Sequence, residues 1–211
     1  MHETTKKYYE KRAQVLIQNL KNRHFDAYYC PDAASALEKA LELIPKEATV
    51  GWGGALSAEQ IGLLDALRAR NPVFDRYSAP TPEEFNARMK QALLANVFIT
   101  GANAISMDGQ MVNIDGLGNR VAAIVYGPDK VVVVAGMNKV VDTVEDAVTR
   151  ARTVAAPMNK QRFPNQTPCE VTGKCGDCKA EGCICNQILI TRHCRPAGRI
   201  QFILVGETLG M

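Results

Sequence analysis

The sequence predicts an α/β protein built on a mostly parallel sheet with helices on both faces, followed by a small cysteine-rich C-terminal extension. Strand-like segments alternate with capped amphipathic helical segments along most of the 211 residues, a pattern typical of βαβ units. Val131 to Gly136 is apolar at every position, as expected for a strand buried on both faces. Six of the seven cysteines fall between Cys169 and Cys194. We therefore expect a core over residues 1–160 and an extension over 161–211, which includes the closing strands and packs on the same domain.

The composition narrows the class of protein. A net charge of +3 is too small and too evenly spread to indicate a nucleic-acid binder. The longest apolar runs have the length of strands and are far too short for a membrane span. The first residues are charged and contain no apolar signal-peptide core. We expect a cytoplasmic protein with neither nucleic acid nor membrane as a partner.

The first elements are expected in a regular order. Residues Glu3 to Leu20 read as an amphipathic helix that could dock on the core or on a second subunit, so we expect a homo-oligomer such as a homodimer. Asp26 to Cys30 is a short strand. Leu37, Leu41 and Ile44 share one face of the next helix, which Pro45 ends. Thr49 to Trp52 is a buried strand that enters a glycine-rich turn.

Two helices carry start signals. Ser57 with Gln60 matches a capping box, which predicts a helix with Ile61, Leu64 and Leu67 inward. Thr81 is a predicted N-cap, with Pro82 in the first turn and Glu84 completing the box. The apolar stripe of this second helix consists of Phe85, Met89 and Leu93.

The remaining elements alternate in the same way. Asp108-Gly109 is a hairpin signal between two strand-like segments. Thr143 with Asp146 is expected to cap a helix that runs to about Val154 and ends at Pro157. Further strands are expected at Val97 to Thr100, Ala104 to Met107, Gln110 to Ile114, Gln187 to Arg192 and Arg199 to Val205, and a helix at Val121 to Tyr126.

Two glycine-rich turns suggest an anion site. Val50 to Gln60 places a glycine turn between a strand and a helix start, where unpaired backbone N–H groups favour a phosphate or carboxylate. Asp115 to Arg120 repeats the arrangement and adds a guanidinium. Lys139 follows the strand that ends at Gly136 and supplies a second cation. Either turn could equally serve only to reverse the chain, and Arg120 could be a surface charge.

These residues carry a family resemblance. Gly101 to Val141, with its Asn-Ile-Asp-Gly-x-Gly-Asn-Arg stretch, together with Val50 to Ser57 and Arg150 to Pro157, resembles the lactate-utilisation (LUD) domain of the LutC/YkgG-like type. The resemblance covers most of the chain. It implies the wider fold superfamily of ribose-5-phosphate isomerase, glucosamine-6-phosphate deaminase and CoA transferase, in which a strand-end glycine loop binds phosphate or CoA. It also implies a role in organic-acid metabolism of the lactate type.

The expected ligand is therefore a small anionic metabolite, or a nucleotide or CoA moiety. The expected binding residues are Gly51, Trp52, Gly53, Gly54, Ser57, Asn103, Asn113, Asp115, Gly118, Asn119, Arg120 and Lys139. Catalysis is a separate question, because the loop at Gly101 lacks the acidic residues that the sugar-phosphate isomerases carry there. Asp108, Asp115 and Lys139 are the catalytic candidates. Two alternatives stay open: a non-catalytic sensing or assembly subunit, and an isomerase or hydrolase acting on a phosphorylated sugar.

The segment from Cys169 to Cys185, called the cysteine segment below, predicts a metal centre. A Cys-x-x-Cys step at Cys175 and Cys178 lets two thiolates reach one metal, and further cysteines complete a four-thiolate set for an iron–sulfur cluster or zinc. The stretch from Thr167 to Asn186 resembles a C-terminal extension of short LUD proteins. That resemblance implies Cys169, Cys175, Cys178 and Cys185 as the ligands, with Cys183 and Cys194 left over. We expect an iron–sulfur cluster, with zinc as the alternative and redox proteins as partners of such a cluster.

Overall fold

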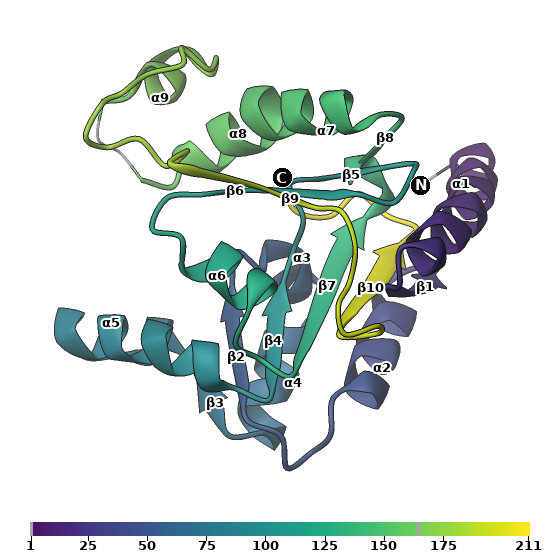
Figure 1. Ribbon diagram of the computed structural model, residues 1–211, viewed down its shortest axis with the longest axis horizontal. Coiled ribbons are helices and arrows are strands. Elements are labelled where there is room, and N and C mark those ends of the chain that lie inside the picture. Colours follow the sequence, from purple (N-terminus) through teal and green to yellow (C-terminus); the bar gives the residue numbers. More distant parts are fainter. Residues whose placement is uncertain (1, 164–165) are drawn as a thin grey trace.

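The computed structural model describes residues 2–163 and 166–211 and places a six-stranded parallel sheet at its centre (Figure 1). Every strand pairing in this sheet is parallel, so the predicted α/β fold class is confirmed. In spatial order the strands are β1 (Asp26–Cys30), β10 (Ile200–Val205), β7 (Lys130–Gly136), β4 (Val97–Thr100), β2 (Val50–Gly53) and β3 (Val73–Phe74).

Helices cover both faces of this sheet, as alternate residues of β7 demonstrate. Val131 and Val133 pack in one core with α1 (Glu3–Asn22) and α6 (Asn119–Val125). Val132 and Val134 pack in the other core, with helices that follow β1 and β2. Those helices are α2 (Ala33–Leu43), α3 (Leu56–Gln60) and α4 (Leu63–Arg70). Since side chains alternate between the faces of a strand, a strand that is apolar throughout fits this two-sided burial.

A second, mixed sheet lies across the end of the large sheet toward which its strand arrows point (Figure 1). Its order is β8 (Val140–Val141), β5 (Ala104–Ser106), β6 (Met111–Asp115) and β9 (Gln187–Thr191). β5 and β6 pair antiparallel, which confirms the hairpin predicted at Asp108-Gly109. The apolar face of this sheet packs on α7 (Val144–Arg150) through Val112 and Ala147.

The helix predicted after the first glycine turn begins differently from the expectation. The N-cap of α3 is Ala55, so Ser57 lies inside the helix and the predicted capping box is wrong. The Ser57 hydroxyl instead contacts the Nζ of Lys139, a tertiary partner that local sequence cannot reveal. Gly62, in the left-handed conformation, then separates α3 from α4.

Pro157 does not end its helix, so that prediction is also wrong. The capping box of Thr143 and Asp146 forms as predicted and starts α7. The helix then passes through a π-helical segment (Ala151–Ala155) and continues as α8 (Ala156–Lys160), with Pro157 in its first turn. A proline lacks the N–H of a regular helix, and the wide π turn lets the chain pass that position.

The N-cap predicted at Thr81 is confirmed in α5 (Pro82–Gln91), where its hydroxyl accepts a hydrogen bond from the backbone N–H of Glu84. The Glu84 side chain does not complete the predicted capping box, because its carboxylate accepts from Arg88 instead. No residue of α5 is fully buried, and Leu93 lies beyond it in a short 3₁₀ helix (Ala92–Leu94). Phe85 and Met89 therefore lie outside the core, whereas Leu93, the last residue of the predicted stripe, packs against it. Two more 3₁₀ helices, Arg76–Ser78 and Met137–Lys139, precede α5 and follow β7.

The residues after α8 complete both sheets. α9 (Pro168–Thr172) is followed by an irregular stretch, and then β9 joins the small sheet. β10 inserts between β1 and β7 as an interior strand of the large sheet, with its six residues buried. The core is thus closed only by the last strand of the chain. No described helix is both long and apolar enough to cross a bilayer.

Candidate ligand-binding site

A cavity of about 330 Å³ lies where the loops after β2, β4 and β6 meet. In a parallel sheet these carboxyl ends are the usual place for a ligand. The structure brings seven of the predicted binding residues to this cavity, and they come from turns far apart in the chain. They are Trp52, Gly54, Asn103, Asp115, Asn119, Arg120 and Lys139.

The other five predicted residues do not line the cavity. Gly51 packs against Ala92, and a Cβ there would lie 2.6 Å from the Ala92 Cβ. The Gly53 carbonyl accepts a hydrogen bond from Thr100. Gly118 is the left-handed N-cap of α6. The remaining two, Ser57 and Asn113, are buried and do not line the cavity. Ser57 accepts a hydrogen bond from Lys139, and Asn113 donates one to the Gly101 carbonyl.

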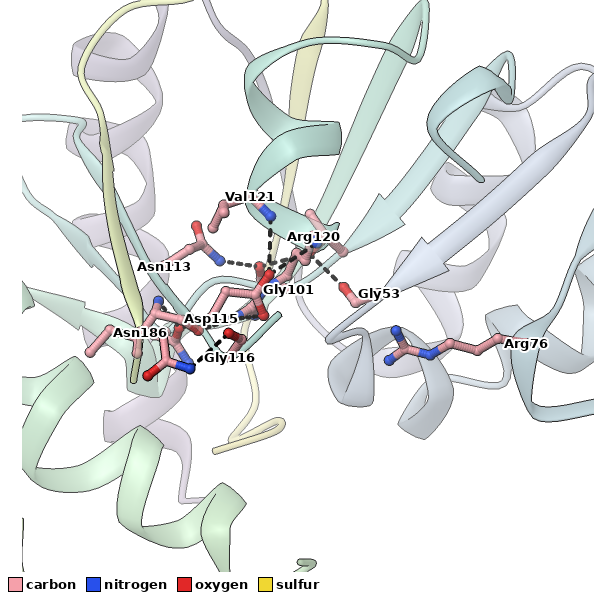
Figure 2. A network of polar contacts seen from close by, with 12 residues as sticks. Gly53, Arg76, Gly101, Asn113, Asp115, Gly116, Arg120, Val121 and Asn186 are labelled. Carbon is pink, nitrogen blue, oxygen red and sulfur yellow. Dashed lines mark hydrogen bonds and ion pairs between the residues drawn. The ribbon is translucent and has the colours of Figure 1, made fainter. Parts of the chain in front are cut away.

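Arg120 is built into the wall of the cavity. Its Nη2 donates to the carbonyl of Ile114 and to Oδ1 of Asn103, and lies 3.7 Å from a carboxylate oxygen of Asp115 (Figure 2). Burial lowers the pKa of Arg120, Asp115 opposes that shift, and Arg76 adds to it. Its Nε is buried without a hydrogen-bond partner in the described structure. A ligand would therefore meet a positive charge held in place by the protein, rather than a guanidinium that is free to reorient.

Asp115 has a structural task that the sequence did not reveal. Its carboxylate accepts hydrogen bonds from the backbone N–H groups of Arg120 (3.0 Å) and Val121 (3.2 Å). These are first-turn donors of α6, whose N-cap residue Gly118 has no side chain to offer. Asp115 therefore caps the helix that carries Arg120.

Lys139 is the most unusual group of the site. Only 4% of it is exposed, and its Nζ donates to Oγ of Ser57 at 3.1 Å. Burial, with smaller contributions from Arg150 and Arg120, lowers the pKa of Lys139 to about 7. Among residues 2–163 and 166–211, no carboxylate lies within 4.0 Å of its Nζ. Lys139 thus adds a positive charge to the floor of the cavity without a carboxylate partner of its own.

Gly54 makes room for this arrangement. Its φ of +59° is a left-handed conformation that side chains rarely adopt. A Cβ there would also lie 2.5 Å from Nη1 of Arg120. The guanidinium therefore rests directly on the Gly54 backbone.

The outer wall of the cavity is aromatic and cationic, and this half was missed in the sequence. Arg76 lies over the rings of Tyr77 and Phe85 at 4.9 and 5.6 Å. Figure 2 shows the Arg76 side chain apart from the Arg120 network and directed toward it. The stripe of α5 was the available signal, because Phe85 and Met89 line the cavity instead of the core. Trp52, on the inner side, has a buried indole N–H without a partner in the described structure.

Asp108 lies away from the cavity, in the β5–β6 turn. Its carboxylate pairs with Arg23 at 2.7 Å and accepts hydrogen bonds from Ser106 and Gln110. Burial raises the pKa of Asp108, and these bonds and the Arg23 charge outweigh it, so the net shift is downward. Asp108 therefore fastens the hairpin to α1 and faces no ligand.

The six cysteines between Cys169 and Cys194 divide into two groups. Five of them line a second cavity of about 190 Å³: Cys169, Cys175, Cys178, Cys183 and Cys185. Cys194 is buried in the core near β10, where its thiol donates to the carbonyl of Pro196. Burial and three neighbouring cysteines raise the pKa of Cys185 to about 12. In this conformation no three His, Cys, Asp or Glu side chains of the described residues lie close enough together to hold a metal ion.

Comparison with known proteins places the chain in a family. A search of curated sequences finds no match. A crystal structure of a DUF162 family protein from Deinococcus radiodurans is similar, with a TM-score of 0.53 and 13% sequence identity over 93% of this chain and 97% of that one. At that identity the likeness shows the fold alone. The family model of the LUD domain matches residues 13–205, which is nearly the whole chain. This chain therefore belongs to the LUD domain family.

Proposed function

We propose that this LUD domain binds a small organic anion in the cavity floored by Lys139 and Arg120. The single observation that carries the proposal is the burial of Lys139 without a carboxylate partner in the described structure. A buried charge normally has a partner, because desolvation without compensation is costly. The carboxylate or phosphate of a ligand would supply the missing partner.

The chemistry of the walls indicates the rest of the ligand. Tyr77 and Phe85 line the outer side of the cavity together with the cation of Arg76, and Trp52 lines the inner side. A cavity of about 330 Å³ holds a metabolite or part of a larger cofactor. A nucleotide or CoA moiety would use both the aromatic and the cationic walls, whereas a lactate-type acid would use the floor. Both fit a role in organic-acid metabolism.

A binding role without chemistry is the second candidate, in the form of a sensing or assembly subunit. The positions of the two aspartates favour it, since Asp115 caps α6 and Asp108 fastens a hairpin. Isomerase or hydrolase action on a phosphorylated sugar would need a free acid or base. Of the three catalytic candidates, Lys139 alone both faces the cavity and forms no ion pair in the described structure, since Asp115 pairs with Arg120 and Asp108 with Arg23.

The binding proposal is tested by titrating L-lactate, inorganic phosphate, ADP and CoA into the protein. Trp52 is the only tryptophan of the chain and lines the cavity, so its fluorescence reports occupancy, with calorimetry as a second readout. We expect Lys139→Met to weaken binding at least tenfold. The matched control is Lys130→Met, because Lys130 begins the strand that Lys139 follows and binds the Leu43 carbonyl at the other end of the sheet. Equal affinity of both variants and the wild type for every ligand would rule out the site.

The cysteine segment supports a second part of the proposal, a metal centre held by Cys169, Cys175, Cys178 and Cys185. Thiols suit an iron–sulfur cluster or zinc, and all four lie around one cavity. Bound there, a cluster would supply one-electron transfer to redox partner proteins, and zinc would supply a structural crosslink. Anaerobic purification with iron, sulfide and zinc analysis separates these outcomes. A colourless protein without bound metal would exclude both.

A further inference from the structure

We propose that the cysteine segment is a movable wall of the ligand cavity, with Cys183 among the metal ligands, so that metal binding and anion binding are coupled through Ile184. This inference rests on the proposed function, because it needs both an anion in one cavity and a metal in the other. It adds a ligand, Cys183, and a physical link between the two sites.

The two cavities share a wall. Ile114 and Ile184 are the residues that line both of them. Ile184 stands between Cys183 and Cys185 in the chain, and both of these cysteines face the second cavity. Two aliphatic side chains thus separate the anion cavity from the thiols. One of them belongs to Ile184, whose backbone is joined by peptide bonds to Cys183 and Cys185. A shift of the backbone at either cysteine therefore moves this wall.

The same segment is fastened to the turn that holds Arg120. The backbone N–H of Asn186 donates to the carbonyl of Asp115, and its Nδ2 donates to the carbonyl of Gly116, both at 3.0 Å (Figure 2). A Cβ on Gly116 would lie 3.4 Å from the Ile184 Cα, so the two backbones are in close contact. Asp115 in turn holds the N–H groups that begin α6. Displacement at the thiols therefore reaches the cationic floor through backbone contacts.

Metal binding requires the cysteine thiols to move closer together. The thiols line the second cavity, but no three described ligand side chains converge closely enough for a metal. Thiolates bind zinc at about 2.3 Å, so binding has to draw them inward. The Cys183 sulfur already accepts a weak hydrogen bond from the backbone N–H of Cys185, at 3.4 Å, which places it beside a predicted ligand.

The second cavity is also prepared for negative charge. Lys160 is fully buried on its lining, and its Nζ donates to the carbonyl of Phe163 at 2.7 Å. Arg152 lines the same cavity. Arg152 is paired with Asp177, which lines this cavity too. A set of four thiolates around a divalent metal carries excess negative charge, and Lys160, which pairs with a backbone carbonyl, would offset part of it. Cys194 lies apart from this cavity, in the apolar core.

The coupling is tested in the full chain with zinc and ADP as probes. Zinc is titrated into chelator-treated protein, and hydrogen exchange of residues 114–121 is followed by mass spectrometry. We expect zinc to slow exchange in this turn and to raise the affinity for ADP about fivefold or more, the usual range of coupling between sites. A parallel sample is loaded anaerobically with iron and sulfide. Failure of both metals to bind would overturn the proposal.

Three variants isolate its parts. Cys183→Ser is expected to lower zinc affinity at least tenfold, whereas Cys194→Ser, the matched thiol control, should leave it unchanged. Asn186→Ala removes the side-chain bond to Gly116 and should retain zinc while losing part of the exchange protection in the turn.

The two proposals fail in distinguishable ways. If zinc slows exchange but no anion binds with or without metal, the proposed function is wrong. The link between the metal site and the turn of residues 114–121 would then still hold. If an anion binds with the same affinity and the turn exchanges at the same rate with and without zinc, the coupling is wrong. Wild-type zinc affinity in Cys183→Ser would remove that residue from the ligand set.

Discussion

Two lysines of this chain are buried in different ways, and the contrast shows what Lys139 is for. Lys160 donates to a backbone carbonyl, an acceptor that satisfies it without a ligand. Lys139 reaches a serine hydroxyl and faces Arg120 and Arg150 as electrostatic neighbours. Stability alone would favour an apolar residue at such a position. The retained ammonium group therefore supports a binding role.

The pH dependence of anion binding follows from the same residue. With a pKa of about 7, Lys139 is charged below neutrality and loses its proton as the pH rises. An anion favours the charged form, so we expect affinity for phosphate or ADP to fall as pH rises above about 7. The measurement is calorimetric titration from pH 6 to 9, corrected for phosphate ionisation. Lys139→Met should bind weakly with little dependence on pH, and a wild-type curve that is flat over this range would contradict the assignment.

At the scale of elements, the site depends on a glycine turn packed against a capped helix. Gly54 has a left-handed backbone and carries the Arg120 side chain on its open face. Asp115, at the start of the second glycine turn, caps α6 through the backbone N–H of Arg120 and also lies close to the Arg120 guanidinium. The same carboxylate therefore fixes the start of α6 and the cation of Arg120. The two glycine-rich turns thus hold Arg120 in place. Their glycines, Gly54 and Gly116, let the Arg120 side chain and the Ile184 backbone respectively come into close contact.

Gly54→Ala tests this arrangement against a matched control. Gly62 has a comparable φ of +78° and nothing within 4 Å of its missing Cβ. Both alanine variants should lose about 1–2 kcal/mol of unfolding free energy through the left-handed backbone. Gly54→Ala also displaces Arg120, so we expect it alone to weaken anion binding at least tenfold. Denaturant unfolding and Trp52 fluorescence titration measure the two effects. Equal loss of affinity in both variants would show that backbone strain, rather than Arg120, is responsible.

At the scale of the molecule, the cysteine segment connects the two sheets. It follows α8 and is bonded to the Asp115 turn through Asn186. It leads into β9 of the small sheet and then into β10, an interior strand of the large sheet. A metal that crosslinks this segment would restrain the chain between the two sheets.

Metal loading is therefore expected to stabilise the whole domain. A metal that binds the folded protein preferentially raises its unfolding free energy, by about 2.7 kcal/mol at a free concentration 100 times the Kd. We expect the melting temperature to rise on zinc addition, to return on chelation, and to rise equally in Cys194→Ser relative to its own apo form. Differential scanning calorimetry measures it. An unchanged melting temperature despite bound zinc would show that the segment does not restrain the fold.

The sequence by itself determined the class of fold. Alternation of strands and capped helices, and the unbroken apolar run of β7, required a sheet buried on both faces, and the hairpin at Asp108-Gly109 followed from turn chemistry. Glycine turns and cations also pointed to loops that line one cavity, because strand ends are set by local pattern. The cluster of cysteines was visible in the same way.

Only the tertiary structure decided which side chains share a cavity. Ser57 left its expected cap for Lys139, Asp115 became the cap of α6, and the stripe of α5 turned toward the ligand cavity. The division of the thiols, with Cys183 inside the group and Cys194 apart from it, also appeared only there. The physical reason is that local propensity acts between near neighbours in the chain, whereas burial and pairing of charge depend on residues that folding brings together.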